Sequence, residues 1–176
     1  WDYVAIDRNE KMLTLLGQST LVYCSEVPPF PKELQCASCD LAYSAFVLEH
    51  MKNGVEAYTF VQGLADLVKK DGGLVALVVP DALNLKMEFW NLDYTHTYPT
   101  CTRNVTQILE ECGLKVEFMR RYRGPGWIGW KYWLLCILGM FYHYRFWAWL
   151  LRQDRLAYSI FQYIKQDILL FICRKS

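Results

Sequence analysis

Short apolar runs alternate with amphipathic stretches along the first two thirds of the chain, and one more apolar run lies near its carboxyl end. Apolar runs of strand length predict β-strands, whereas apolar residues that recur every three or four positions predict helices. The predicted strands are 1–6, 20–23, 39–44, 74–79, 114–119 and 167–173. The predicted helices are 9–16, 57–70 and 104–112, and a glycine follows each of them within two residues.

Strands that alternate with helices predict right-handed βαβ crossovers, and hence a mostly parallel sheet with helices on both faces. The run 74–79 is apolar at every position, as expected for a strand that is buried on both sides. Ligands bind at the carboxyl ends of the strands in such α/β sheets. Candidate binding residues are therefore those that follow a predicted strand, namely Asp7, Ser25 with Glu26, residues 44–50, and Pro80 with Asp81.

Length, charge and cysteine usage narrow the class of protein. The chain has 176 residues with 19 basic and 18 acidic side chains, which predicts one domain over 1–176 and no nucleic-acid partner. Seven cysteines, an odd count, lie mostly in apolar runs, so we expect no disulfide framework and an intracellular, reducing compartment. Cys36 and Cys39 form an isolated C-x-x-C pair without a second pair, and no metal site is predicted.

The segment after Gly126 carries the chain's excess of aromatic side chains. It predicts an aromatic-rich helical insertion at 124–165, placed before the last strand. His143 and Arg145 lie near the middle of its most apolar stretch, so we expect residues 127–164 to form two helices that do not span a bilayer. Three alternatives remain open at this stage: a peripheral membrane surface, a protein partner, and a cover on the domain's own sheet.

Five segments in one order carry a family resemblance: YVAIDRNEKML, VPPFP, CDLAYSAFVLEHM, GGLVALVVPD and ILEECGLKVEFM. With them the chain resembles the class I S-adenosylmethionine-dependent methyltransferases, closest to the small-molecule, lipid and glycan enzymes. The resemblance covers about 1–119 and the last strand, and it implies a Rossmann-like fold and S-adenosylmethionine as cofactor. The family's first strand and glycine-rich turn have no counterpart in this sequence. We expect them upstream of Trp1 in a longer natural protein, or else to have been lost.

The resemblance also implies the residues that bind the methyl donor. Asp7 would hold the ribose hydroxyls, although an aspartate before a helix is equally typical of a helix cap. Arg8 would lie beside the adenine, and Ser25 with Glu26 would contact the adenine amino group. Cys24 stands where the family often has an acid. The turn of Ser44, Ala45 and Phe46 would pass under the methionine part of the donor.

On the acceptor side, the segment DYTHTYPTCTRNVTQILEECG resembles the family's substrate loop. His96 is a candidate general base for a hydroxyl, oriented by Asp93, and a pair that merely caps the loop is the competing interpretation. His50 is expected to play only a supporting role. The sequence thus predicts methyl transfer to an oxygen of a small, lipidic or lipid-linked glycan acceptor. The alternative is a non-catalytic, methyltransferase-like subunit that docks on a partner or membrane through 127–164.

Overall fold

The computed structural model describes residues 2–17, 20–34, 38–123 and 128–175. Strands and helices alternate along the chain, as the sequence predicts. The strands are β1 (Val4–Asp7), β2 (Leu21–Cys24), β3 (Leu41–Ala45), β4 (Leu74–Pro80), β5 (Leu114–Arg123) and β6 (Asp167–Lys175). The helices are α1 (Glu10–Leu13), the 3-10 turn η1 (Leu48–His50), α2 (Gly54–Leu67), α3 (Ala82–Leu85), α4 (Glu88–Leu92), α5 (Thr102–Glu111), α6 (Trp130–Phe141), α7 (Tyr144–Leu151) and α8 (Asp154–Lys165).

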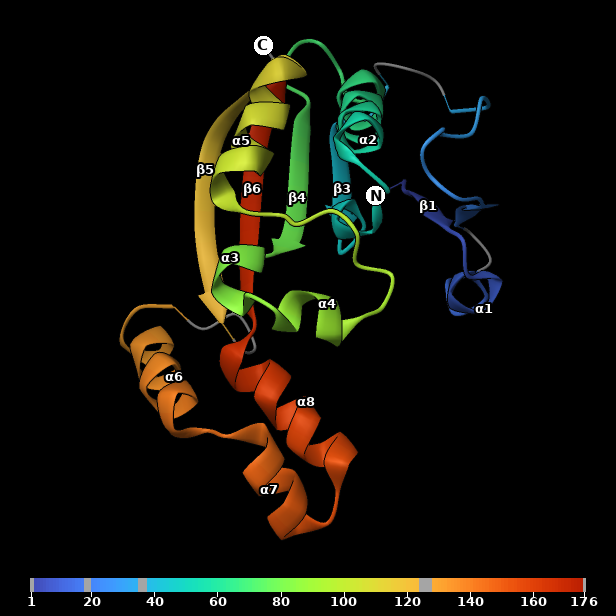
Figure 1. Cartoon of the computed structure of the whole chain (residues 1–176). Helices are drawn as coiled ribbons and strands as arrows, with labels where there is room; N and C mark the ends of the chain where they lie inside the picture. Colours follow the sequence, from blue (N-terminus) through green and yellow to red (C-terminus); the bar gives the residue numbers. More distant parts are fainter. Residues whose placement is uncertain (1, 18–19, 35–37, 124–127, 176) are drawn as a thin grey trace.

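Four strands form the main sheet in the order β3-β4-β6-β5 (Figure 1). β3 and β4 are parallel, and β6 runs antiparallel to both of its neighbours, β4 and β5. The direction of β6 follows from its connection: the helices between β5 and β6 begin and end at the same edge of the sheet, so the chain must return antiparallel. Because β3, β4 and β5 point the same way, their carboxyl ends share one edge. The α/β architecture agrees with the prediction, but the main sheet is mixed: one of its three strand pairs is parallel and two are antiparallel.

β1 and β2 form a separate parallel pair, in which Asp7 is the partner of Cys24. Figure 1 shows this pair and α1 beside the β3 edge of the main sheet. The loop that follows β2 ties the pair to the domain, because the Phe30 ring stacks on Phe60 of α2 with centroids 5.7 Å apart. Within the described residues, the β1–β2 pair has no strand-to-strand hydrogen bonds to the main sheet.

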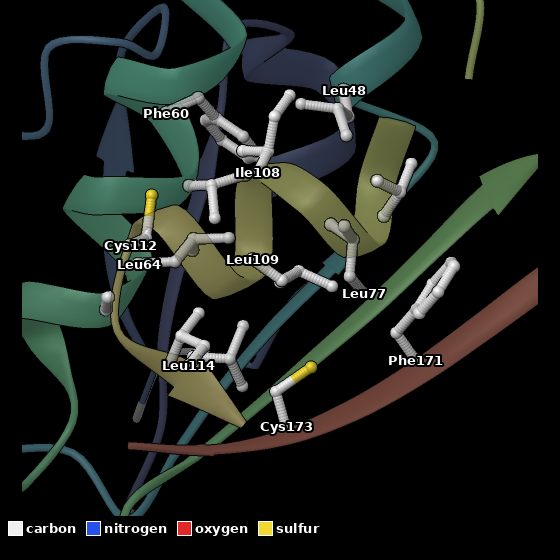
Figure 2. Close-up of a cluster of buried hydrophobic side chains, with 14 of the residues drawn as sticks. Leu48, Phe60, Leu64, Leu77, Ile108, Leu109, Cys112, Leu114, Phe171 and Cys173 are labelled. Carbon is white, nitrogen blue, oxygen red and sulfur yellow. The ribbon is translucent and has the colours of Figure 1, made fainter. Parts of the chain in front are cut away.

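The main hydrophobic core lies between the sheet and the helices α2 and α5 (Figure 2). Alternate residues of the strands point into it, including Leu77 of β4 and Phe171 of β6, which are fully buried. α2 contributes Phe60 and Leu64 at helical spacing, and α5 contributes Leu109. On the opposite face, the side chains of the edge strand β3 remain half-exposed, at 52% for Leu41 and 63% for Tyr43. The core therefore covers one face of the sheet and holds the four strands in place relative to one another.

The aromatic segment was predicted to form two helices. The structure has three there, α6, α7 and α8. Tyr142 and His143 separate the first two, and the left-handed Arg152 (φ 50°) ends α7 before α8 begins. The predicted insertion begins at 124, and residues 124–127 lie outside the described residues. In Figure 1 the three helices extend from the carboxyl-end edge of the main sheet. They pack mainly on one another, and α6 and α8 also contact β5.

Other element boundaries shift for local reasons. α2 begins at Gly54, before the predicted start at 57, because the Asn53 side chain accepts hydrogen bonds from the amides of Val55 and Glu56. β5 continues to Arg123, since that residue pairs with Asp167 at the start of β6. The short helices α3 and α4 were not predicted, and α3 begins where Asp81 caps it.

Candidate functional site

The donor-side candidates lie at the carboxyl end of the β1–β2 pair. Asp7 ends β1, and its carboxylate accepts a hydrogen bond from the Asn9 amide at 2.7 Å. Asn9, not Asp7, caps α1, because the Asn9 side chain accepts from the amide of Lys11. The amide of Ser25 donates to the Asp7 carbonyl at 3.1 Å, which brings Ser25 next to Asp7. Because Asn9 caps α1, Asp7 is not needed as the helix cap. The Asp7 side chain is exposed at the end of its strand.

Its neighbours share this strand-end position. Arg8 and Glu26 are exposed, and Ser25 is half-buried. Cys24 lies directly opposite Asp7, and its thiol is 3.8 Å from the Arg8 carbonyl. The sequence-predicted donor residues of this pair are thus brought together at one end of the two strands.

The turn after β3 has an unusual backbone. Phe46 adopts φ 56°, a left-handed conformation that is strained for an aromatic residue and that often marks functional turns. Its amide donates to the Val78 carbonyl of β4 at 2.9 Å, which holds the turn against the sheet. The Phe46 side chain is 42% exposed, and Ala45 is half-buried. The buried Ser44 hydroxyl has no hydrogen-bond partner among the described residues.

The loop before α5 is fastened onto η1. The amides of Thr97 and Tyr98 both donate to the Glu49 carbonyl at 3.0 Å, and the Thr97 hydroxyl donates to the Met51 carbonyl at 2.7 Å. This attachment places His96 beside His50, with ring centroids 5.0 Å apart. Two histidines separated by 45 residues in sequence therefore share one site.

Each of these histidines is held through its Nδ1 atom. Nδ1 of His50 lies 2.9 Å from the Thr95 hydroxyl, which donates to Asp93 at 2.7 Å. Nδ1 of His96 lies 2.7 Å from the carbonyl of Phe89 in α4. We expected Asp93 to orient His96, but its carboxylate contacts Thr95 and so positions His50. The Phe89 carbonyl orients His96.

Glu49 adds a buried carboxyl to the two rings. Glu49 is only 1% exposed. Its Oε2 atom has no hydrogen-bond partner in the described part of the chain. Glu49, His50 and His96 each offer one ligand atom, and these atoms all lie within 4.8 Å of one another. The arrangement is capable of binding a proton or a cation between its members.

Burial controls the electrostatics of this cluster. It raises the pKa of the Glu49 carboxyl to about 7, and the nearby Asp93 charge acts in the same direction. Burial also lowers the pKa of the His50 imidazole, and the nearby His96 acts in the same direction, whereas the hydrogen bond to the Thr95 backbone and the Asp93 charge oppose it. Hydrogen bonds from Thr95 lower the pKa of Asp93.

Glu49 and His50 contribute more to this site than their sequence context predicts. Their signal was present in the segment SAFVLEH, because both residues follow the third predicted strand within a few positions. Only the fold shows that the loop with His96 folds back onto them. By contrast, Asp81 has a structural role, since it caps α3 and pairs with Arg121 at 2.6 Å.

The helices α6 and α7 carry several exposed aromatic side chains beside the strand ends. Trp130, Trp133 and Trp149 are exposed at 72%, 66% and 74%, and Phe141 at 80%. In the part of the chain that the structure describes, no single helix has the length and apolar character to cross a bilayer. α6 and α7 meet these criteria only as a pair, and they are bent by 73° relative to each other.

Neither a protein-family model nor a curated protein sequence matches the chain. Solved structures match its fold. A proposed methyltransferase from Bacillus halodurans is 16% identical, with a TM-score of 0.62 over 98% of this chain and 82% of the other. An S-adenosylmethionine-dependent methyltransferase from Archaeoglobus fulgidus is 14% identical, with a TM-score of 0.61 over 98% and 75%.

A third match is the N-methyltransferase NodS from Bradyrhizobium japonicum in complex with S-adenosylhomocysteine. It is 13% identical to this chain, with a TM-score of 0.60 over 99% of this chain and 66% of the other. These likenesses establish the fold: the chain folds as a class I, Rossmann-like methyltransferase domain. The predicted fold class is confirmed.

Proposed function

We propose that this protein transfers a methyl group from S-adenosylmethionine to an oxygen of a small, lipidic or lipid-linked glycan acceptor. The observation that carries the proposal is the position of the predicted donor residues at the ends of β1, β2 and β3. Asp7 ends β1, the strained Phe46 follows β3, and the loop with His96 is fastened beside that turn. Ligands of α/β sheets bind at this edge.

On the donor side, Asp7 accepts hydrogen bonds from the two ribose hydroxyls, as an exposed carboxylate at a strand end can. Arg8, Ser25 and Glu26 surround the adenine. The backbone of the turn from Ser44 to Phe46 lies under the methionine part of the donor, and the half-exposed Phe46 ring supplies an apolar contact.

On the acceptor side, His96 acts as base or orienting group for the hydroxyl that is methylated. Its Nδ1 faces a carbonyl, which can only accept, so Nδ1 carries the proton and Nε2 keeps a lone pair. Asp93 contributes through Thr95 and His50. Because the sulfonium donor is already activated, positioning the acceptor in line with the methyl group supplies much of the acceleration.

The helices α6 and α7 supply the membrane part of the proposal. Residues 128–166 contain five basic side chains and one acidic side chain. Exposed tryptophans with flanking Lys131, Arg145 and Arg152 fit the headgroup region of an anionic bilayer, where arginines can reach water. This peripheral contact brings the strand-end site close to a lipid-linked acceptor.

A non-catalytic, methyltransferase-like subunit is the second candidate. One observation favours it: β1 and β3 are not joined by hydrogen bonds within the described residues, so no continuous sheet sets the distance between Asp7 and the His96 cluster. Such a subunit retains the fold and docks through α6 and α7 without binding the methyl donor.

Two measurements on the same protein separate the candidates. Calorimetry with S-adenosylhomocysteine tests the donor site, and incubation with radiolabelled S-adenosylmethionine and a total membrane lipid extract tests transfer. If the protein is the enzyme, S-adenosylhomocysteine should bind saturably, and the radiolabelled methyl group should be recovered with the lipids in the organic phase. A folded protein that binds no S-adenosylhomocysteine contradicts the enzyme. Binding together with label only in the aqueous phase contradicts the lipidic acceptor.

A further inference from the structure

The cluster of Glu49, His50 and His96 contains more acceptor capacity than its protein neighbours satisfy. We propose that these three side chains bind a divalent transition-metal ion of the Zn²⁺ type. No metal site was predicted from the sequence, where the only candidate is the isolated C-x-x-C pair of Cys36 and Cys39. The three ligands come from two segments that are far apart in sequence, and their ligand atoms lie within 4.8 Å of one another.

The hydrogen bonds fix which nitrogen of each histidine is available. The Thr95 hydroxyl donates its proton to Asp93, so it accepts from Nδ1 of His50. The Phe89 carbonyl accepts from Nδ1 of His96. Both rings therefore carry their proton on Nδ1 and keep a lone pair on Nε2. Metal-binding histidines are held in this way, with the second nitrogen donating to a carbonyl or a polar side chain.

The third ligand is the carboxyl of Glu49, whose Oε2 atom is buried and without a partner among the described residues. A buried, unsatisfied carboxyl oxygen is costly unless something binds it. Two imidazoles and one carboxylate form a ligand set typical of catalytic Zn²⁺ and of Fe²⁺, and unlike the oxygen-only sets that bind Mg²⁺.

The position of the site gives the metal a role that rests on the proposed function. Three protein ligands leave a coordination position open, and His50 and His96 are half-buried, so an acceptor hydroxyl can reach it. The ion would lower the pKa of that hydroxyl. The hydroxyl proton then passes to water, the oxygen–carbon bond forms as the sulfur–carbon bond breaks, and S-adenosylhomocysteine leaves. His96 acts in this step as a ligand that positions the ion.

The test is metal binding by the whole protein after removal of metal with a chelator. Calorimetry with Zn²⁺ should show one site that Mg²⁺ does not fill. Glu49→Gln, His50→Ala and His96→Ala should each weaken Zn²⁺ binding at least ~10-fold, because changing a residue that only hydrogen-bonds to a metal ligand already costs that much. The matched control is His143→Ala, which removes the third histidine of the chain from a position in the aromatic helices. Zn²⁺ binding that is equally strong in all four variants overturns the proposal.

Cysteines are the competing Zn²⁺ ligands, and Co²⁺ distinguishes them. Binding to two histidines and a carboxylate gives Co²⁺ ligand-field bands without a thiolate charge-transfer band. A charge-transfer band that disappears in Cys39→Ser overturns the assignment to this cluster.

A measurement on the unsubstituted protein covers the case in which a variant fails to fold. Zn²⁺ should shift the ¹⁵N signals of Nε2 in two of the three histidines, and unshifted signals at saturating Zn²⁺ overturn the proposal. S-adenosylhomocysteine binding is measured in the same samples. Intact donor binding without Zn²⁺ binding refutes the metal site alone, whereas Zn²⁺ binding without donor binding refutes the proposed function alone.

Discussion

Asp167, the first residue of β6, forms a buried ion pair with Arg123, the last residue of β5. The same carboxylate accepts a hydrogen bond from Tyr132 of α6 at 2.9 Å, and the Arg123 guanidinium lies 5.1 Å from the centre of the Tyr132 ring. This contact joins the aromatic helices to the sheet at the point where the chain leaves it and returns. It fixes both ends of the helical segment at one edge.

The first prediction concerns this ion pair. Asp167→Ala should lower the free energy of unfolding by about 3–5 kcal/mol, because it leaves the Arg123 charge buried without a partner. Urea denaturation followed by circular dichroism measures the change. Glu117→Ala is the matched control, since it removes a carboxylate from the exposed pair with Arg174 on the same two strands and should change little. Equal effects of the two substitutions would contradict a special role for Asp167.

The second prediction tests the donor site. Asp7→Ala should weaken the binding of S-adenosylhomocysteine by about 1.5–3 kcal/mol, the loss expected when a charged hydrogen-bond acceptor is removed. Calorimetry measures the affinity. Asp2→Ala is the control, because Asp2 is an exposed aspartate close to the start of the same strand. A folded Asp7→Ala protein with unchanged affinity would show that Asp7 does not contact the ribose.

The third prediction concerns His96. His96→Ala should lower turnover by ~10²-fold or more and leave the affinity for S-adenosylhomocysteine unchanged, whether His96 acts as a base or holds an ion. His143→Ala should leave turnover unchanged. Equal turnover of the His96 variant and the wild-type protein would make His96 a loop residue, oriented by Phe89 for structural reasons only.

The fourth prediction uses the buried thiols of the core. Burial raises the pKa of Cys112 to about 11 and that of Cys173 to about 12. Only the thiolate reacts with iodoacetamide, so near pH 8 both side chains should stay unmodified in the folded protein and react after unfolding. The exposed Cys24 should react in the folded state. Mass spectrometry of tryptic peptides measures the difference, and rapid labelling of Cys173 in folded protein would contradict the packing of β6 in the core.

The fold was largely predictable from local patterns, and the candidate site only in part. The runs 74–79 and 167–173 correspond to β4 and β6 because a buried strand needs an apolar side chain at nearly every position. The direction of β6 was not predictable, since it depends on where the aromatic helices begin and end. Nor was the number of those helices, because the break at Tyr142 and His143 carries no glycine or proline.

The site shows the same division between local and long-range information. Strand ends locate Asp7 and the turn from Ser44 to Phe46, because a strand end is a local feature. The contact between His50 and His96 is made by hydrogen bonds of Thr97 and Tyr98 to the Glu49 carbonyl, and no local pattern encodes these. For this reason the sequence paired Asp93 with His96, its neighbour, and missed the path through Thr95 to His50.

The last prediction is that α6 and α7 bind an anionic membrane surface without crossing it. Trp133 and Trp149 are exposed, and replacing both by alanine removes large aromatic side chains suited to the headgroup region. The whole protein should float with vesicles of phosphatidylcholine and phosphatidylserine, less with phosphatidylcholine alone, and much less after the double substitution. Tyr43→Ala with Tyr94→Ala is the matched control, since both tyrosines are exposed outside these helices.

The topology of that membrane contact follows from β5 and β6. Because Arg123 and Asp167 are partners in one sheet, both ends of the helical segment must lie on the same side of the bilayer. Arg145 lies between those ends, where a charge in the hydrocarbon core costs about 2.5–3.5 kcal/mol but at the surface can reach water. Protease added outside the vesicles should therefore cleave on both flanks of the segment. Protection of one flank alone would refute the topology, and absence of flotation with every lipid would favour a protein partner for this surface.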